Sequence, residues 1–75
     1  MNIRIPAIEV VAQVCLKGIR DKRGSAIASR SDVIAGLRKL FSPLGVEERE
    51  AEAAIRQAAA LGLVAELADG TLRVP

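Results

Sequence analysis

Apolar residues recur at helical spacing along the first four fifths of the chain and then alternate singly with polar ones. The helical pattern predicts helices over residues 7–20 (or to Asp21), 30–41 and 46–61. Two alternating stretches follow, 63–67 and 71–74, in which Leu63, Ala65 and Leu67, and then Leu72 and Val74, form the apolar sets. The order predicts an α+β, mostly helical fold of three helices followed by a β-hairpin.

Turn and cap residues lie where these elements should begin and end. Pro6 suits the start of the first helix, where its missing N–H is not needed. Ser29 and Asp32 have the spacing of a capping box at the start of the second helix, with Ser31 as the alternative cap. Gly62 suits the end of the third helix, and Asp69-Gly70 is a strong signal for a hairpin turn.

The segment between the first two helices has a pattern of its own. Gly24 and Ser25 are expected to break the first helix, and residues 26–28 form a possible short strand before the second. Residues 1–6 are expected to be extended. With no internal repeat or linker-like stretch, the sequence predicts a single domain over residues 1–75.

The first helix has more apolar surface than a monomer needs. Its polar residues form one narrow stripe of Glu9, Gln13, Lys17 and Arg20. The remaining apolar arc is far wider than the roughly 100° that a surface helix buries. We expect the excess, at Ala7, Val10 and Val14, to be covered either by a second subunit in a homodimer or by the hairpin and N-terminal segment of the same chain.

Composition narrows the possible functions. The chain is 51% hydrophobic, has Phe41 as its one aromatic residue and contains no His. We therefore expect no metal site, no cofactor and no enzymatic activity. The single Cys15 suggests a buried small side chain and a reducing, cytoplasmic setting. The longest apolar stretch, 8–16, is too short and too interrupted to span a membrane, so no membrane association is expected.

Charge is unevenly distributed, although the net charge is only +2. Residues 1–40 carry eight Lys and Arg against three Asp and Glu (+5), whereas residues 41–75 carry three against six (−3). The basic residues Lys17, Arg20, Lys22 and Arg23 cluster near the end of the first helix. They either contact phosphates or complement the negative end of the helix dipole.

The order of elements resembles the winged helix-turn-helix superfamily over about residues 7–74. The resemblance rests on the junction Leu61-Gly62-Leu63-Val64 and on the Asp69-Gly70 turn of the hairpin, or wing. It implies that the third helix enters the DNA major groove. Base reading would then fall to Arg49, Arg56 and Gln57, and phosphate contacts to Arg30, Arg38, Lys39 and Arg73.

Two functions follow from this resemblance. The first is a small DNA-binding protein, a dimeric transcriptional regulator or accessory factor that reads duplex DNA with its third helix. The second is a protein-interaction module that binds no nucleic acid. The second is favoured by the wide apolar arc of the first helix and by the acidic segment 47–52, which could dock on a basic partner. Against DNA binding, Glu47, Glu48 and Glu50 would repel phosphates, and the only cation of the wing is Arg73.

Overall fold

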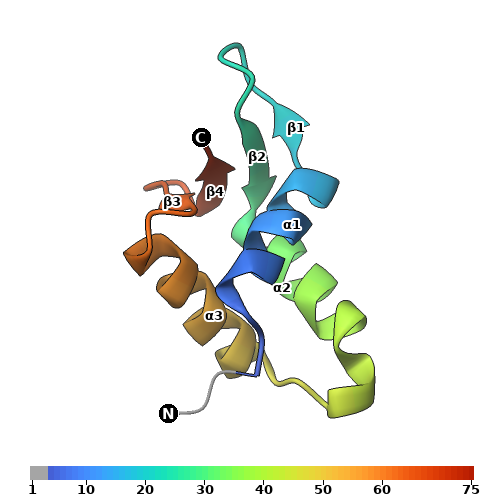
Figure 1. Cartoon of the computed structure of the whole chain (residues 1–75). Helices are drawn as coiled ribbons and strands as arrows, with labels where there is room; N and C mark the ends of the chain where they lie inside the picture. The colour runs from blue at the N-terminus through green and yellow to red at the C-terminus, as the bar shows by residue number, and fades with distance from the viewer. Residues whose placement is uncertain (1–3) are drawn as a thin grey trace.

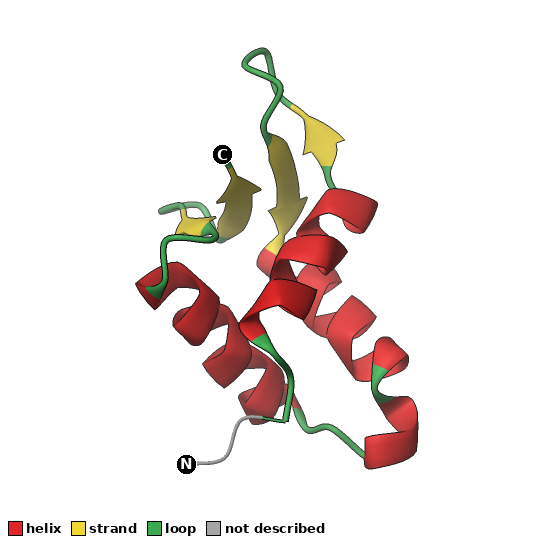
Figure 2. Ribbon diagram, viewed as in Figure 1, coloured by secondary structure: helices red, strands yellow, loops and turns green. Residues whose placement is uncertain are grey.

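Three helices and one small antiparallel sheet make up the fold, so the expected α+β class is confirmed (Figures 1 and 2). The architecture was obtained as a computed structural model that describes residues 4–75. The expected extended segment at residues 1–3 lies outside the described residues. The elements are α1 (Ala7–Lys17), β1 (Ile19–Arg20), β2 (Ala26–Ser29), α2 (Arg30–Leu40), a 3-10 turn η1 (Ser42–Leu44), α3 (Glu48–Ala60), β3 (Ala65–Glu66) and β4 (Thr71–Val74).

The sheet has the strand order β1-β2-β4-β3, with every neighbouring pair antiparallel. The possible strand before the second helix is therefore present as β2, and it pairs with the second strand of the wing from Ala26–Val74 to Ser29–Thr71. Helix, strand, two helices and a hairpin in this pairing are consistent with a winged-helix-like arrangement. β1 adds a fourth strand on the outer side of β2.

The first helix is shorter than expected: it ends at Lys17 rather than at Arg20 or Asp21. Gly18 leaves the helix in an extended conformation (φ −80°, ψ 160°) and brings its backbone against β2. A Cβ atom at this position would lie 2.6 Å from the carbonyl oxygens of both Val14 and Ile27. The close approach requires glycine and lets the chain turn directly into β1.

Val10 and Val14, two of the interface candidates, need no second subunit to cover them. Both side chains are fully buried within the chain, and Ala7 is half-buried against the same core. The core also includes Ile5, which comes before the first helix. Helices α2 and α3 pack against α1 together with β2 and β4. The alternative of cover within one chain therefore holds for this side of α1, although the other helices provide much of that cover. The buried apolar residues are Ile5, Val10, Val14, Ala26, Ala28, Val33, Ile34, Leu37, Val46, Ala51, Ala54, Ile55, Ala58, Val64 and Leu72.

The polar stripe of α1 does not face the solvent as a whole. Gln13 is only 7% exposed and packs over Gly36 of α2, whose missing side chain leaves room for it. The outward side of α1 is apolar instead and carries Ile8, Ala12, Cys15 and Leu16. Cys15 is exposed, so the expectation that it is buried was wrong.

Local signals at the other helix ends were mostly correct. The Ser29 hydroxyl accepts a hydrogen bond from the Asp32 amide (3.1 Å), which identifies Ser29 as the N-cap of α2. Gly62 ends α3 with φ +75°, and the amides of Gly62 and Leu63 donate to the carbonyls of Ala59 and Ala58. This pair of bonds is the Schellman motif that a left-handed glycine makes possible.

The first strand of the wing was expected to form its apolar set from Leu63, Ala65 and Leu67, and the structure differs. Val64 is buried, whereas Ala65 and Leu67 are exposed. The Schellman motif fixes the path of the chain after Gly62, and that path turns Val64 inward. The turn is a three-residue loop, 68–70, closed by bonds from the Leu67 amide to Thr71 and from the Gly70 amide to Leu67.

No helix in residues 4–75 is both long and apolar enough to cross a bilayer.

Candidate nucleic-acid interface

The outward side of α3 presents the three residues expected to read bases. Arg49, Arg56 and Gln57 are all exposed, because Ala51, Ala54, Ile55 and Ala58 turn the opposite side of the helix into the core. Arg49 is also within 2.8 Å of Glu47, and both side chains are largely exposed. An exposed ion pair of this kind is weak and is easily exchanged for a phosphate contact.

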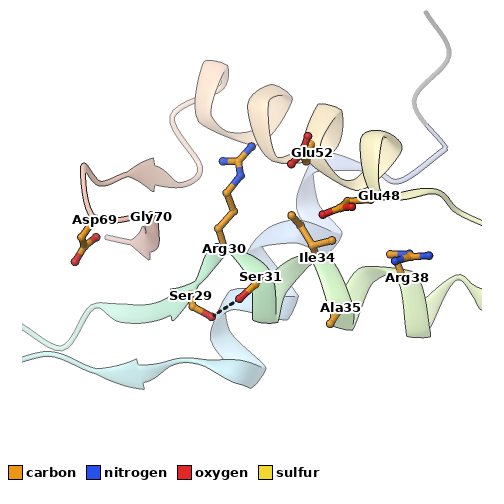
Figure 3. A pocket seen from close by; sticks show the side chains of 10 residues that line it. All are labelled: Ser29, Arg30, Ser31, Ile34, Ala35, Arg38, Glu48, Glu52, Asp69 and Gly70. Carbon is orange, nitrogen blue, oxygen red and sulfur yellow. Dashed lines mark hydrogen bonds between the residues drawn. The ribbon is translucent and has the colours of Figure 1, made fainter.

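A groove lies beside this surface, between the N-terminal parts of α2 and α3 and the tip of the wing (Figure 3). The amide of Arg30 donates to the Gly70 carbonyl (3.0 Å), which ties the wing to the start of α2 and forms one end of the groove. The groove has a volume of about 570 Å³. Its lining residues are Ser29, Arg30, Ser31, Ile34, Ala35, Arg38, Glu48, Glu52, Asp69 and Gly70.

The charges in this groove are mixed. Two of the expected phosphate-binding residues, Arg30 and Arg38, line it together with three carboxylates. Arg30 is paired with Glu66 of the wing at 2.9 Å, and in Figure 3 its side chain extends from α2 toward α3. Lys39 is exposed on the last turn of α2 and does not line the groove. The groove is therefore poorly suited to phosphate.

The Asp69 carboxylate at the wing tip serves the turn itself. Its Oδ1 atom accepts from the Thr71 hydroxyl (2.7 Å) and from the Thr71 amide (3.1 Å). The hydroxyl, and then the amide, hold the pKa of Asp69 below its ordinary value of 3.8. Asp69 is thus ionised at neutral pH and adds a negative charge to the wing tip.

Arg73 lies away from that tip. It sits half-buried on β4, in register with Ile27 of β2 and Ala65 of β3. The pKa of Asp21 is lowered first by the Ser25 amide, then by the Arg23 amide, and by the charge of Arg73. Because Arg73 pairs with Ile27 of β2 and its charge lowers the pKa of Asp21, it lies near the β1–β2 hairpin and does not extend the proposed reading surface of α3.

The strongest basic cluster lies on the β1–β2 hairpin, which projects from the top of the molecule in Figure 1. Lys22 and Arg23 form its turn, Arg20 lies on β1, and Lys17 is the last residue of α1. All four side chains are exposed. Only Lys17 lies in the last turn of α1, so the helix dipole does not account for the other three.

The turn of this hairpin is fixed by its one acid. Asp21 Oδ1 accepts from the amides of Arg23 (2.8 Å) and Ser25 (2.9 Å), and the Asp21 amide donates to the Ser25 carbonyl (2.9 Å). The cations are therefore held on an ordered β-turn. The four basic residues were recognised in the sequence. The hairpin that carries three of them was not predicted, because the first helix was expected to extend to Arg20 or Asp21.

Among residues 4–75, no group of three His, Cys, Asp or Glu is placed to hold a metal ion. Comparisons with protein-family models, curated protein sequences and solved structures gave no significant match.

Proposed function

We propose that the protein is a small DNA-binding protein, a transcriptional regulator or accessory factor that binds duplex DNA with α3. The observation that carries this proposal is the exposed side of α3, where Arg49, Arg56 and Gln57 project from one helix. Arginine can pair bidentately with guanine and glutamine with adenine in the major groove. We place the activity in the cytoplasm, since the free Cys15 suits a reducing setting.

The β1–β2 hairpin supplies the backbone contacts in this proposal. Its cations contact the phosphates in place of the wing tip, which carries Asp69 rather than a Lys or Arg. Phosphate contacts release counterions and make binding strongly dependent on salt. Base contacts determine which sequences are preferred. The two surfaces should therefore affect different observables.

A selection from random duplexes followed by fluorescence anisotropy over a series of salt concentrations tests the proposal. We expect Arg49→Ala with Arg56→Ala to lower affinity for the selected site by about 1–3 kcal/mol per arginine and to relax its sequence preference. Lys22→Ala with Arg23→Ala removes the same charge. It should instead weaken binding to all duplexes equally and lower the slope of log affinity against log salt concentration by about 2.

A control comes from the acids beside the proposed reading surface. Glu48→Gln with Glu52→Gln removes two negative charges from the groove next to Arg56, and it should strengthen binding. If wild type binds no duplex even at low salt, DNA binding is wrong. If the α3 and hairpin variants behave alike, α3 does not read bases.

The three carboxylates of the groove favour a second candidate, a protein-interaction module. Glu48, Glu52 and Asp69 outnumber the two arginines in it, and Arg30 is already paired with Glu66. A basic segment of a partner protein would suit this groove. Under this function, Glu48→Gln with Glu52→Gln weakens partner binding, the opposite of its expected effect on DNA.

A further inference from the structure

The outward side of α1 exposes aliphatic side chains. Ile8 is 60% exposed and Leu16 is 76% exposed, and the exposed Ala12 and Cys15 lie on the same side of the helix. We call these four residues the α1 outer face. A polar residue of the same helix, Gln13, is buried instead. Aliphatic side chains gathered on one exposed side of a helix, with a glutamine buried on another, mark a candidate contact surface.

We propose that a second copy of this chain covers the α1 outer face, with the two α1 helices antiparallel about a two-fold axis at Ala12. The face reads large, small, large at Ile8, Ala12 and Leu16, with four residues between each. This pattern is symmetric about Ala12, so a two-fold axis there places Ile8 of each copy against Leu16 of the other. The small alanine lets the two helices approach closely.

Charge supports the antiparallel orientation. Glu9 lies in the first turn of α1 and Lys17 in the last. An antiparallel pair brings Glu9 of each copy toward Lys17 of the other and also opposes the two helix dipoles. A parallel pair would place like charges side by side.

The size of the face sets the expected strength of association. At about 32 Å² per side-chain carbon, Ile8 and Leu16 leave roughly 170 Å² of aliphatic surface exposed. Stable interfaces bury about 800 Å² per partner, and α1, with eleven residues, is only about 16 Å long. Two such faces at about 25 cal/mol per Å² give about 8.5 kcal/mol, of which association itself costs at least about 4 kcal/mol. The dimer is therefore weak, with a dissociation constant of hundreds of micromolar.

Sedimentation equilibrium of the chain without DNA tests the proposal directly. We expect the mean mass to rise with concentration from 7.9 kDa toward twice that value. Leu16→Ala places two substitutions in each dimer and should raise the dissociation constant about 100-fold. Ile8→Glu with Leu16→Glu should remain monomeric, with its helical circular dichroism intact because both residues are exposed.

A matched control uses aliphatic residues exposed elsewhere. Leu44 and Leu61 are 53% and 59% exposed, and Leu44→Glu with Leu61→Glu should associate like wild type. If this control also abolishes association, apolar exposure in general is responsible and the specific face is wrong. If wild type remains at 7.9 kDa up to about 500 µM, a different molecule covers α1 and the proposal fails.

Cys15 tests the orientation independently of any variant that fails to fold. It is the one cysteine of the chain and lies three residues from the proposed axis. The two Cys15 residues of the dimer are then about 9 Å apart along the helices and, with helix axes about 8–10 Å apart, about 12–13 Å from each other. A bismaleimide of that span should give a covalent dimer, and Cys15→Ser should give none. Rapid formation of a direct disulfide would overturn the antiparallel arrangement.

Discussion

Gly18 lies at a position where the neighbouring backbone leaves no room for a side chain. Its φ of −80° is accessible to any amino acid, so only space excludes a side chain. In Gly18→Ala the new Cβ would lie 2.6 Å from the Val14 and Ile27 oxygens, whereas ordinary contacts begin at 3.4 Å. Both obstacles are backbone atoms. Relief of the Ile27 contact requires α1 and β2 to separate, and relief of the Val14 contact requires the last turn of α1 to distort.

The cost of that separation has two parts. Overpacking of this kind typically costs about 1–3 kcal/mol. The Gly18 amide also donates to the Val14 carbonyl at 2.7 Å, and weakening this bond adds about 1 kcal/mol. We therefore expect Gly18→Ala to lower the free energy of unfolding by about 2–4 kcal/mol. For a domain of this size, that lowers the melting temperature by at least about 8 °C.

Two other glycines provide controls in the same assay, urea unfolding followed by circular dichroism. In Gly36→Ala the Cβ meets the movable end of Gln13, and the gain in helix propensity of about 0.5–1 kcal/mol offsets this contact. Gly24→Ala meets no atom within 4 Å but has φ +82°, which costs about 1–2 kcal/mol. Were Gly18→Ala to be as stable as Gly36→Ala, the proposed close approach of α1 and β2 would be incorrect.

Two further predictions concern a cap and the response to acid. Ser29→Ala removes the N-cap of α2 and should lower the free energy of unfolding by about 1 kcal/mol, while Ser31→Ala, whose hydroxyl caps no amide, should change it far less in the same denaturant titration. The folded pKa values of Asp21 and Asp69 lie below 3.8, so these carboxylates stabilise the fold above that pH. That contribution is lost as pH falls through the folded pKa values. Melting temperatures measured from about pH 6 to about pH 2 should therefore fall less steeply for Asp21→Asn with Asp69→Asn than for wild type, and equal slopes would contradict this assignment.

The features that the sequence predicted correctly are those with a local physical cause. Ser29 caps α2 through its own hydroxyl, and Gly62 ends α3 because it can adopt a positive φ. The outward position of Arg49, Arg56 and Gln57 followed from the burial of Ile55 and its alanine neighbours. Each of these three features can be predicted from a few residues that are close together in the sequence.

The rotation of α1 could not be read from its own residues. Val, Ile, Ala and Cys occupy most of its circumference, so no single direction is preferred for burial. The direction was decided elsewhere: Gly36 of α2 leaves a space that Gln13 fills, and Val10 and Val14 join Ile5 in the common core. The β1–β2 hairpin was missed for a related reason, since Gly18 is tolerated in a helix unless another strand passes close to it.

The pairing of β2 with β4 has a consequence for how the chain folds. Its partners, from Ser29–Thr71 to Ala26–Val74, are separated by 42 (71 − 29) to 48 (74 − 26) residues. During synthesis, α1, β1 and β2 therefore emerge well before β4, and β2 must wait with one edge unpaired. Exposed edges of this kind are where chains aggregate. Closing a long loop last also makes sheet formation the slow step of folding. Removal of residues 71–74 should thus expose the β2 edge and leave a chain that associates through it, rather than a smaller stable domain.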